Sequence, residues 1–471
     1  MRMIYAILTA STLFLSCASA PKRQSSPVKN QVPNAWTAGS TISDRQSIKV
    51  YWWRDFQDTQ LDSLITNALK YNYNLKAAAQ RVQAARAQAT IVGAPLFPQV
   101  SLGLNGAKRH QNFIGFPIPG SGGGGVLSTT ATTYGLSTNL NWEIDLWGRL
   151  RNDKAAALAD YQGAQADHLG ARLSLSGQTT KSWFAAIEAR RQLDLAQSTR
   201  DNFQAVNDQI QTRYESGLRP PLDLRLSLSN VATAEAVVAL RRQQYDGAVR
   251  QLEILLGRYP AAELAIAQDL LPMPAPIPAG LPADLIARRP DLMIAERQVA
   301  AANARVKVAK RARYPSISLT SSGGTSSANL SNLLSGDFIV WSFAGNLLQP
   351  LFQGGRLRAG IKLAEANQEQ ALAGFAEQAL RAYGEVESAL MAETYLRDRE
   401  NALREASEQA VAARELAENR YTRGVSDVIT LLGSQRRAFE AEGQYLTVRR
   451  QRLDARVDLY LALGGGFGEI D

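Results

Sequence analysis

The chain has 471 residues, of which 45% are hydrophobic and 20% charged, a composition that is typical of a folded protein and excludes a disordered one. Its formal net charge is +9. The basic residues are scattered among acidic ones on alanine- and glutamine-rich stretches, with no basic patch interleaved with aromatic residues. We therefore interpret the charge as a solvated surface and expect no nucleic-acid partner.

The N-terminus is typical of an export signal. Arg2 is followed by an apolar run from Ile4 to Leu15, which is too short to cross a membrane as a helix. We predict a signal peptide at residues 1–16. No later run reaches the 18 apolar residues that a transmembrane helix needs, so no such helix is expected.

Cys17, directly after this signal, is the only cysteine and has no partner for an internal disulfide. A lone cysteine in this place is typical of a bacterial lipoprotein. We expect a covalent lipid on Cys17 and a lipidated N-terminal segment at residues 17–60. The alternative is ordinary cleavage after Ala20, which would leave Pro21 as the first residue, a position at which signal peptidases tolerate proline poorly.

Residues 99–145 alternate apolar and polar side chains, the pattern of strands with one apolar face. We predict a β-hairpin here, preceded by a short helix at 61–92, with the glycine-rich stretch 120–125 as a solvent loop. Strands of about ten residues with this alternation are typical of a transmembrane β-barrel. A soluble sheet with one buried face has the same alternation and is the alternative.

A long helix is expected next. No proline occurs between Pro119 and Pro220. This window predicts a continuous helix at residues 148–217, roughly 100 Å long at about 1.5 Å per residue. Such a helix exceeds any ordinary domain. A shorter helix is expected at 223–256, and the proline-rich residues 257–283 are expected to form a linker between repeats.

The same series of elements then occurs again. The motif Arg-Tyr-x-x-Gly at 213–217 recurs 207 residues later at 420–424, and upstream the offset is 217 because the first copy holds ten extra residues. A duplicated unit is one architectural module used twice. We predict structural repeat 1 at residues 61–256, structural repeat 2 at residues 284–464 and a C-terminal tail at 465–471. The elements expected in repeat 2 are a short helix at 284–312, a β-hairpin at 316–349, a long helix at 355–424 and a short helix at 430–463.

The expected helix lengths match, because two short helices end to end are as long as one long helix. This indicates antiparallel pairs in which a long helix lies beside two stacked short ones, with alanine-rich seams that allow close approach. Independent helical hairpins are the alternative, but they leave the matched lengths unexplained.

Four strands per chain cannot close a membrane barrel, and an open sheet edge is not tolerated in lipid. Either the strands are soluble or several chains pool them. Three copies would supply twelve strands for one barrel and would place their long helices in one continuous ring. The predicted fold class is an α+β membrane protein with an internal tandem duplication, in which each chain gives four β-strands and long helices to the assembly.

Several motifs in the chain resemble those of a known protein family. They are WWRDFQDTQLD at 52–62, WEIDLWGRL at 142–150, QPLFQGGRL at 349–357, the two Arg-Tyr-x-x-Gly motifs and the lone Cys17. In these motifs the chain resembles the outer-membrane factor family, the TolC/OprM-like exit ducts. It is most similar to the lipidated branch that serves resistance-nodulation-division efflux systems. The resemblance covers essentially the whole chain after the signal.

The resemblance implies a homotrimer in the outer membrane of a Gram-negative bacterium, lipid-anchored, with a 12-stranded β-barrel in outer-membrane lipid and a periplasmic α-helical barrel. It implies two protein partners, a periplasmic adaptor (membrane fusion) protein and an inner-membrane resistance-nodulation-division pump. The function implied is a passive exit duct for small molecules such as drugs and toxic compounds. An outer-membrane duct for type I protein secretion is one alternative, and a non-pore periplasmic coiled-coil adaptor is another.

The resemblance also implies where the adaptor docks, at the tips of the two helical hairpins. Glycine lets the chain turn out of a long helix without a Cβ penalty, and an exposed apolar residue beside it offers a contact. A plain helix-ending turn is the alternative. The expected docking residues are Gly217, Leu218, Gly424 and Val425.

The family places its periplasmic gate where the second tip leads into its returning helix. Tyr421 and Arg436 match the gate-linking pair of the family, so a polar lock predicts that their removal raises conductance. Gly433 lies where related ducts often carry an acidic residue, and Ile429, one turn before it, is expected to supply an apolar constriction instead. Whether the gate is polar or apolar is left open. The expected gate residues are Tyr421, Asp427, Ile429 and Arg436, with Asp208 or Glu215 as further charge partners.

No pattern predicts an enzyme. The chain has two histidines, His110 and His168, no spare cysteine, no zinc-protease motif and no phosphate-binding loop. The glycine-rich stretch 120–125 formally matches a dinucleotide motif, but prolines precede it and no helix is expected after it. We expect no catalytic residue, no metal site and no cofactor other than the covalent lipid.

Overall fold

The computed structural model describes residues 19–22, 36–38, 50–113, 127–277 and 285–465. The expected signal peptide, Cys17 and the glycine-rich stretch 120–125 lie outside the described residues. The chain divides into two compact units, and each draws on both repeats. The sheet unit comprises residues 1–24, 83–162 and 297–373, and the helical unit comprises residues 25–82, 163–296 and 374–471.

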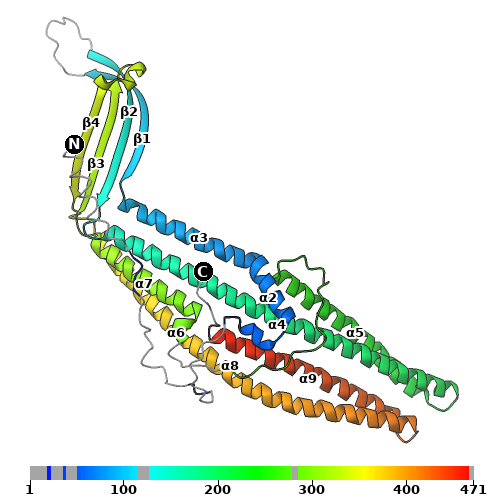
Figure 1. Cartoon of the computed structure of the whole chain (residues 1–471). Coiled ribbons are helices and arrows are strands. Elements are labelled where there is room, and N and C mark those ends of the chain that lie inside the picture. Colours follow the sequence, from blue (N-terminus) through cyan, green and yellow to red (C-terminus); the bar gives the residue numbers. More distant parts are fainter. Residues whose placement is uncertain (1–18, 23–35, 39–49, 114–126, 278–284, 466–471) are drawn as a thin grey trace, which may run out of the picture. The chain divides into compact units, whose positions relative to one another are not determined.

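The sheet unit contains a four-stranded antiparallel sheet in the order β1-β2-β3-β4 (Figure 1). The central pair β2–β3 joins the hairpin of the first repeat to that of the second, with Ile144 opposite Ile317. In the described part of the chain, β1 and β4 each pair on one side only, so the sheet has two open edges. The strands are β1 (Gln99–Phe113), β2 (Leu127–Ile144), β3 (Ser316–Ser327) and β4 (Ile339–Leu348), and the 3-10 helices η6 (Leu330–Leu334) and η7 (Gly336–Phe338) lie between β3 and β4.

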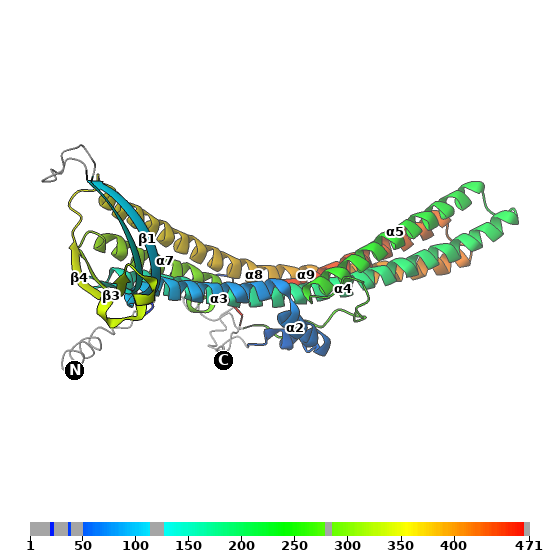
Figure 2. The ribbon, with the colours of Figure 1, turned by 90° about the horizontal axis from the view of Figure 1, so that it is seen from above.

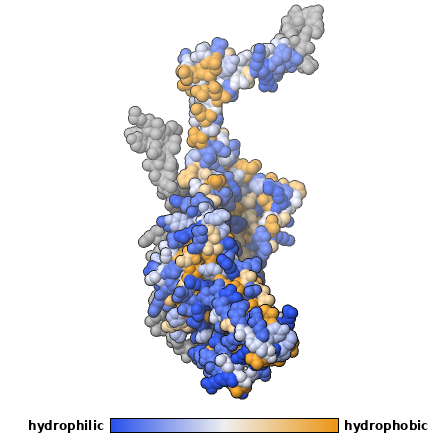
Figure 3. All heavy atoms as spheres, turned by 90° about the vertical axis from the view of Figure 1, so that its right-hand side faces the viewer, coloured by the Kyte–Doolittle hydropathy of each residue, from blue (hydrophilic) through white to orange (hydrophobic). Residues whose placement is uncertain are grey.

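The two faces of this sheet differ in polarity, because the strand period of two sends neighbouring side chains to opposite faces. One cross-strand row on the first face is Val100, Leu140, Ser321 and Phe343, and the next row on the second face is Ser101, Asn139, Ser322 and Ser342. On the edge strands β1 and β4 the large apolar side chains of the first face are solvent-exposed, and Figure 3 shows hydrophobic residues gathered on the sheet. Those exposed on this face include Val100, Leu102, Leu104, Ile339, Trp341, Phe343 and Leu347.

Two very long helices run through the chain, α4 in the first repeat and α8 in the second, each of 67 residues. At about 1.5 Å per residue each is roughly 100 Å long. Figures 1 and 2 show α5 beside α4 and α9 beside α8, and α5 and α9 have 35 residues each. Within the described ranges, no helix combines the length and the apolar character needed to cross a membrane. The helices are α2 (Thr59–Tyr71), α3 (Tyr73–Gly93), α4 (Arg149–Glu215), α5 (Pro221–Leu255), α6 (Leu285–Arg288), α7 (Pro290–Arg311), α8 (Arg356–Thr422) and α9 (Val428–Ala462), with the short 3-10 helices η3 (Trp52–Phe56) and η4 (Ala94–Leu96).

The short helices meet end to end at two equivalent joints in the helical unit. At the first joint, Asn72 separates helix α2 from helix α3. Its side-chain oxygen accepts from Leu75 N at 3.0 Å, and its Nδ2 donates to Leu255 O, at the end of α5, at 3.0 Å. At the second, Arg289 separates α6 from α7 and its Nη1 donates to Ala462 O at the end of α9 at 3.0 Å. These positions are related by the same offsets of 217 and 207 as the sequence motifs.

The breaks at these joints correct the prediction of single helices at 61–92 and 284–312. Each break has its own physical cause. Arg289 precedes Pro290, and a residue before proline is pushed out of the helical conformation. Asn72 precedes no proline, and it is held in an extended conformation by its capping side chain and by its contact with α5.

Aromatic residues near the N-terminus pack against the helices of the helical unit. Trp52 stacks on Tyr460 with ring centroids 4.9 Å apart, and Phe56 lies 5.2 Å from Phe184. Beside them, Asp58 accepts from Trp183 Nε1 at 2.8 Å and also caps α2. The motif at 52–62 therefore forms part of the main hydrophobic core of this unit.

The described part of the linker between the repeats is held by hydrogen bonds and by buried apolar side chains. The buried Glu253 carboxylate accepts three backbone N–H groups of residues 262–264 at 2.7 to 3.2 Å. Ile266 and Leu270 are buried in the same core as the aromatic residues. The described part of the linker, up to residue 277, is therefore fixed to the helical unit.

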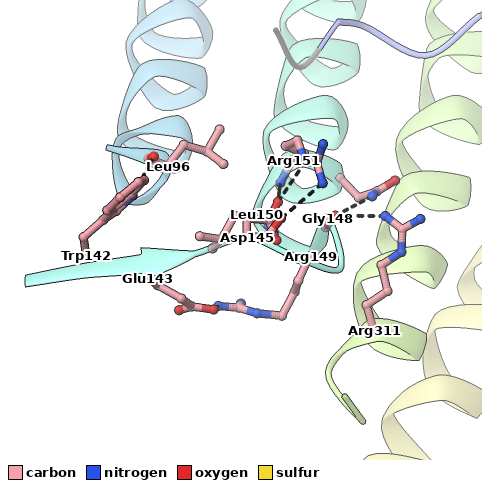
Figure 4. Close-up of polar contacts among 10 residues, drawn as sticks. Leu96, Trp142, Glu143, Asp145, Gly148, Arg149, Leu150, Arg151 and Arg311 are labelled. Carbon is pink, nitrogen blue, oxygen red and sulfur yellow. Dashed lines mark hydrogen bonds and ion pairs between the residues drawn. The ribbon is translucent and has the colours of Figure 1, made fainter. Parts of the chain in front are cut away.

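In the sheet unit, strand β2 leads into helix α4 through a tight, polar turn (Figure 4). The Asp145 carboxylate accepts from Leu150 N at 3.0 Å and from Arg151 N at 2.8 Å, which satisfies the free N–H groups at the start of α4. Gly148 has a φ of +78°, and Arg311 of α7 donates to its carbonyl at 2.9 Å. Arg149 pairs with Glu143 at 2.8 Å. The motif at 142–150 thus encodes the change from strand to helix.

Candidate gate at the hairpin tips

The two hairpin tips have the same backbone geometry. Gly217 and Gly424 have φ values of +75° and +77°, in the left-handed region that favours glycine. Leu218 N donates to Arg213 O at 2.8 Å, and Val425 N donates to Arg420 O at 3.0 Å. These are the bonds of a Schellman motif, in which glycine ends a helix. A Cβ built on either glycine meets nothing within 4 Å, so the conformation and not the space requires glycine.

The residue after each glycine is an exposed apolar one. Leu218 is 74% exposed and Val425 is 62% exposed. In a Schellman motif this position often packs back against the last turn of the helix, but here both side chains face solvent. The four residues predicted for docking therefore lie at exposed tips, two in each hairpin.

Behind the tips, the two hairpins of one chain pack on each other through a shared apolar cluster. Its members come from all four helices, α4, α5, α8 and α9. Tyr421 is among the most buried of them, with 1% of its surface exposed. The buried members are Phe203, Val206, Ile210, Val231, Ala234, Ala417, Tyr421, Val428, Leu431 and Leu432.

Two arginines of the first tip lie close to the ring of Tyr421. The guanidinium carbons of Arg213 and Arg219 are 5.1 Å and 5.3 Å from the ring centroid, which is the range of cation–π contacts. The buried Tyr421 hydroxyl has no hydrogen-bond partner among the described residues. In this structure the ring, not the hydroxyl, connects the two hairpins. The sequence pointed to Tyr421 but not to these arginines, because the contact joins residues that are about 200 positions apart.

Asp427 acts locally. Its carboxylate accepts from Thr430 N at 2.7 Å and caps α9, and this backbone hydrogen bond lowers the pKa of Asp427 below its usual value. The other candidate acids also have neighbours on their own helix. Asp208 accepts from Gln204 at 2.7 Å and Glu215 accepts from Gln211 at 3.0 Å. None of these bonds links one hairpin to the other.

Arg436 and Ile429 both lie on the solvent side of α9. The Arg436 side chain is 70% exposed and pairs loosely with Glu440 at 3.9 Å, four residues further along the helix. Ile429 is 65% exposed. Since the Tyr421 hydroxyl is unpartnered in the described part of the chain, the structure does not bring Tyr421 and Arg436 together within one chain.

Comparison with known proteins agrees with this architecture. The model of the family described as outer membrane efflux protein matches the chain twice, at residues 64–258 and at residues 281–465. The two stretches begin 217 residues apart and end 207 residues apart, which are the offsets of the internal repeat. The chain belongs to the outer membrane efflux protein family.

Relatives of this family match over nearly their whole length. The chain is 32% identical to the pyoverdine export outer membrane protein OpmQ of Pseudomonas putida, over 98% of this chain and 97% of that protein. It is 33% identical to the outer membrane protein OprJ of Pseudomonas aeruginosa, over 99% and 96%. The solved outer-membrane channel OprN superposes with a TM-score of 0.83 at 27% identity, over 96% of this chain and 99% of that one.

These findings confirm the predicted fold class, the outer-membrane location and the functional class, an outer-membrane component of an efflux system. The members of this family are channel-type efflux proteins. The predictions for Cys17, for the tips and for the gate stay predictions.

Proposed function

We propose that three copies of this chain form a passive exit duct for small molecules, with a 12-stranded barrel above a helical tunnel. The observation that carries this proposal is the sheet with one exposed apolar face and two open edges. Lipid tolerates neither unpaired strand edges nor a polar outer face. Pairing β4 of one copy with β1 of the next would remove every edge and would turn the serine- and asparagine-rich face to the interior.

The duct has no catalytic step of its own in this proposal, and it needs no cofactor. The inner-membrane pump would supply the energy, a periplasmic adaptor would join the two proteins, and this chain would supply the passage. Relatives are named for the export of pyoverdine, of toluene and of cations, all small solutes. These names favour small-molecule efflux over the export of proteins through a type I secretion duct.

Single-channel recording tests the duct. Purified trimers in a planar bilayer should conduct ions, and deletion of the gene should sensitise cells to small toxic compounds while leaving protein secretion unchanged. Absence of conductance from assembled trimers would contradict the duct. A secretion defect without a change in susceptibility would favour the type I alternative.

We further propose that residues 1–16 are removed and that a lipid on Cys17 then anchors the N-terminal segment, residues 17–60. In this proposal the segment is followed along the chain by repeat 1, the linker at 257–283 and repeat 2. Two or more acyl chains give a stable anchor, but a barrel would hold the trimer in the membrane without them. Cys17→Ala should abolish metabolic labelling with palmitate and leave the trimer in the outer-membrane fraction. Labelling that survives the substitution would refute the site.

The gate that we propose is an apolar constriction at Ile429, with the Tyr421 ring holding the two hairpins of each chain together. Exposed on the first turn of α9, Ile429 has no acidic neighbour at position 433, where glycine stands. Hydrophobic constrictions stop ions by expelling water. Ile429→Ser should therefore raise conductance in assembled trimers, and an unchanged conductance would exclude Ile429 from the gate.

A further inference from the structure

Two arginines in the first turn of α4 have acidic partners (Figure 4). Arg149 pairs with Glu143 at 2.8 Å. Arg151 pairs with Asp145 at 3.2 Å. Glu143 lies on the polar face of the sheet, because it shares a cross-strand row with Ser318. Arg151 follows Arg149 by two positions, which is about 200° around a helix, so it points away from the polar face.

The equivalent arginines in the first turn of α8 have lost these partners. They are Arg356 and Arg358, 207 residues later, and the positions of the two acids hold Pro350 and Phe352. Arg356 donates to Gln353 Oε1 at 2.6 Å. Arg358 is exposed and makes no ion pair among the described residues. The internal repeat therefore carries a neutralised arginine on α4 and an unneutralised one on α8.

A second cation lies one helical turn after Arg358. Lys362 is exposed and has no acidic partner in the part of the chain that the structure describes. Repeat 1 has Ala155 at the equivalent position. Residues four apart share one side of a helix, where two like charges destabilise it. The pair Arg358 and Lys362 therefore favours the binding of an anion.

The surroundings of this cation pair are apolar and exposed. Leu351 is 92% exposed and Phe352 is 89% exposed. At the same end of the sheet, Trp147 stacks on Tyr314 with ring centroids 5.2 Å apart, and both rings are exposed. Exposed tryptophan and tyrosine are typical of the boundary between lipid and water. The cation pair thus follows the end of the sheet at which this boundary is expected.

A neighbouring copy of the chain would not neutralise these cations at the strand edge. If β4 pairs with β1 of the next copy, the segments brought nearest are α3, β1 and β2. Residues 63–142 include α3, β1 and all but the last two residues of β2, and they contain no aspartate or glutamate. An anionic phospholipid supplies both missing parts, a phosphate for the cations and acyl chains for the apolar residues.

We propose that Arg358 and Lys362, with Leu351 and Phe352 beside them, bind the headgroup phosphate of an anionic phospholipid in the membrane leaflet next to the helices. The guanidinium and ammonium groups contact the phosphate, and the acyl chains lie along the apolar face of the sheet. This inference rests on the proposed barrel and adds a class of lipid to it. In repeat 1 the Asp145 carboxylate takes the place of the phosphate, so each chain has one such site.

Native mass spectrometry of purified full-length trimers tests this site. Trimers mixed with equal amounts of phosphatidylglycerol and phosphatidylcholine should retain phosphatidylglycerol preferentially. Arg358→Gln with Lys362→Gln should abolish the preference. Phe352→Asp should abolish it as well, since it restores the acid that pairs with the arginine in repeat 1. The matched control is Arg356→Gln, which removes the neighbouring arginine on the other side of the helix and should keep the preference.

The remaining outcomes overturn the lipid site. Equal retention of the two lipids by the unmodified trimer would show that no anionic headgroup is recognised, and a preference that survives Phe352→Asp would place the lipid elsewhere. Displacement of phosphatidylglycerol by inorganic phosphate would assign the cations to a soluble anion. A trimer of the Arg358 and Lys362 variant that dissociates at a lower temperature, with unchanged lipid retention, would assign them to a contact between copies. If that variant fails to assemble, Phe352→Asp decides.

The lipid site and the duct can fail separately. Trimers that conduct ions but show no lipid preference would overturn the site and leave the proposed duct standing. Trimers that prefer phosphatidylglycerol but conduct no ions would overturn the duct instead.

Discussion

At the scale of single residues, substitutions of Tyr421 can show whether its hydroxyl or its aromatic ring keeps the gate closed. Its hydroxyl has no partner among the described residues, whereas its ring contacts Arg213 and Arg219. Tyr421→Phe keeps the ring and removes an unsatisfied buried group, so conductance should stay near the wild-type value. Tyr421→Leu removes cation–π contacts worth about 0.5–2 kcal/mol and should raise conductance. A higher conductance of the Tyr421→Phe variant would instead support the polar lock that the family resemblance suggested.

Asp454 gives a prediction about pH. Burial in α9 raises the pKa of Asp454 to about 6 from 3.8, against the opposing charges of Arg450 and Lys181. A raised carboxyl pKa means that the folded state binds the proton more tightly, so stability is lost as pH rises from about 4 to about 6. The loss at neutral pH is on the order of 3 kcal/mol per chain. Asp454→Asn should therefore raise the Tm at pH 7 and not at pH 4.

The control for this measurement is Asp398→Asn, at an exposed carboxylate that pairs with its neighbour Arg397. Its Tm should follow the wild type at both pH values. A Tm gain for Asp454→Asn that is equal at pH 4 and pH 7 would show that the effect is packing and not titration.

At the scale of elements, the tips give a prediction about docking. Gly217 and Gly424 both need a positive φ, and space is free around each of them. Gly217→Val with Gly424→Val should distort both turns by forcing a β-branched residue into the left-handed region, at roughly 1–3 kcal/mol for each turn. Efflux and adaptor crosslinking should be lost while trimers still assemble. The matched control is Gly247→Val, because Gly247 also has free space around it but lies within α5. Normal efflux in the double tip variant would contradict the docking role of the tips.

The elements also show what a sequence alone can and cannot predict here. The proline-free windows and the terminal glycines were sufficient to predict α4 and α8, because local chemistry ends these helices. The break before Pro290 has a local signal as well. The break at Asn72 has only the weak local signal of an asparagine that caps the next helix, and its conformation also depends on a contact with the distant carbonyl of Leu255. The arginines around Tyr421 were missed for the same reason, as tertiary packing alone brings them to the ring.

At the scale of the whole molecule, the polarity of the two sheet faces decides between a membrane barrel and a soluble sheet. Leu102 lies on the apolar face and its neighbour Ser101 lies on the polar one. If the apolar face meets lipid, Leu102→Arg should cost up to about 2–4 kcal/mol per chain, depending on depth, and destabilise the trimer. Ser101→Arg would face the interior, keep the trimer and make the channel more selective for anions.

The measurement is the temperature at which the trimer band dissociates on semi-native electrophoresis, followed by bilayer recording of the variants that assemble. A lower dissociation temperature for Leu102→Arg alone is the expected result. Equal losses for both variants would indicate a sheet that is packed on both faces and would contradict the barrel. A lower dissociation temperature for Ser101→Arg alone would indicate that the polar face is the outer one and that the apolar face lines the interior, which is the opposite of the proposed barrel. Because the two residues are neighbours on one strand, only the direction in which the side chain points differs between them, so the comparison isolates the face of the sheet from its position in the chain.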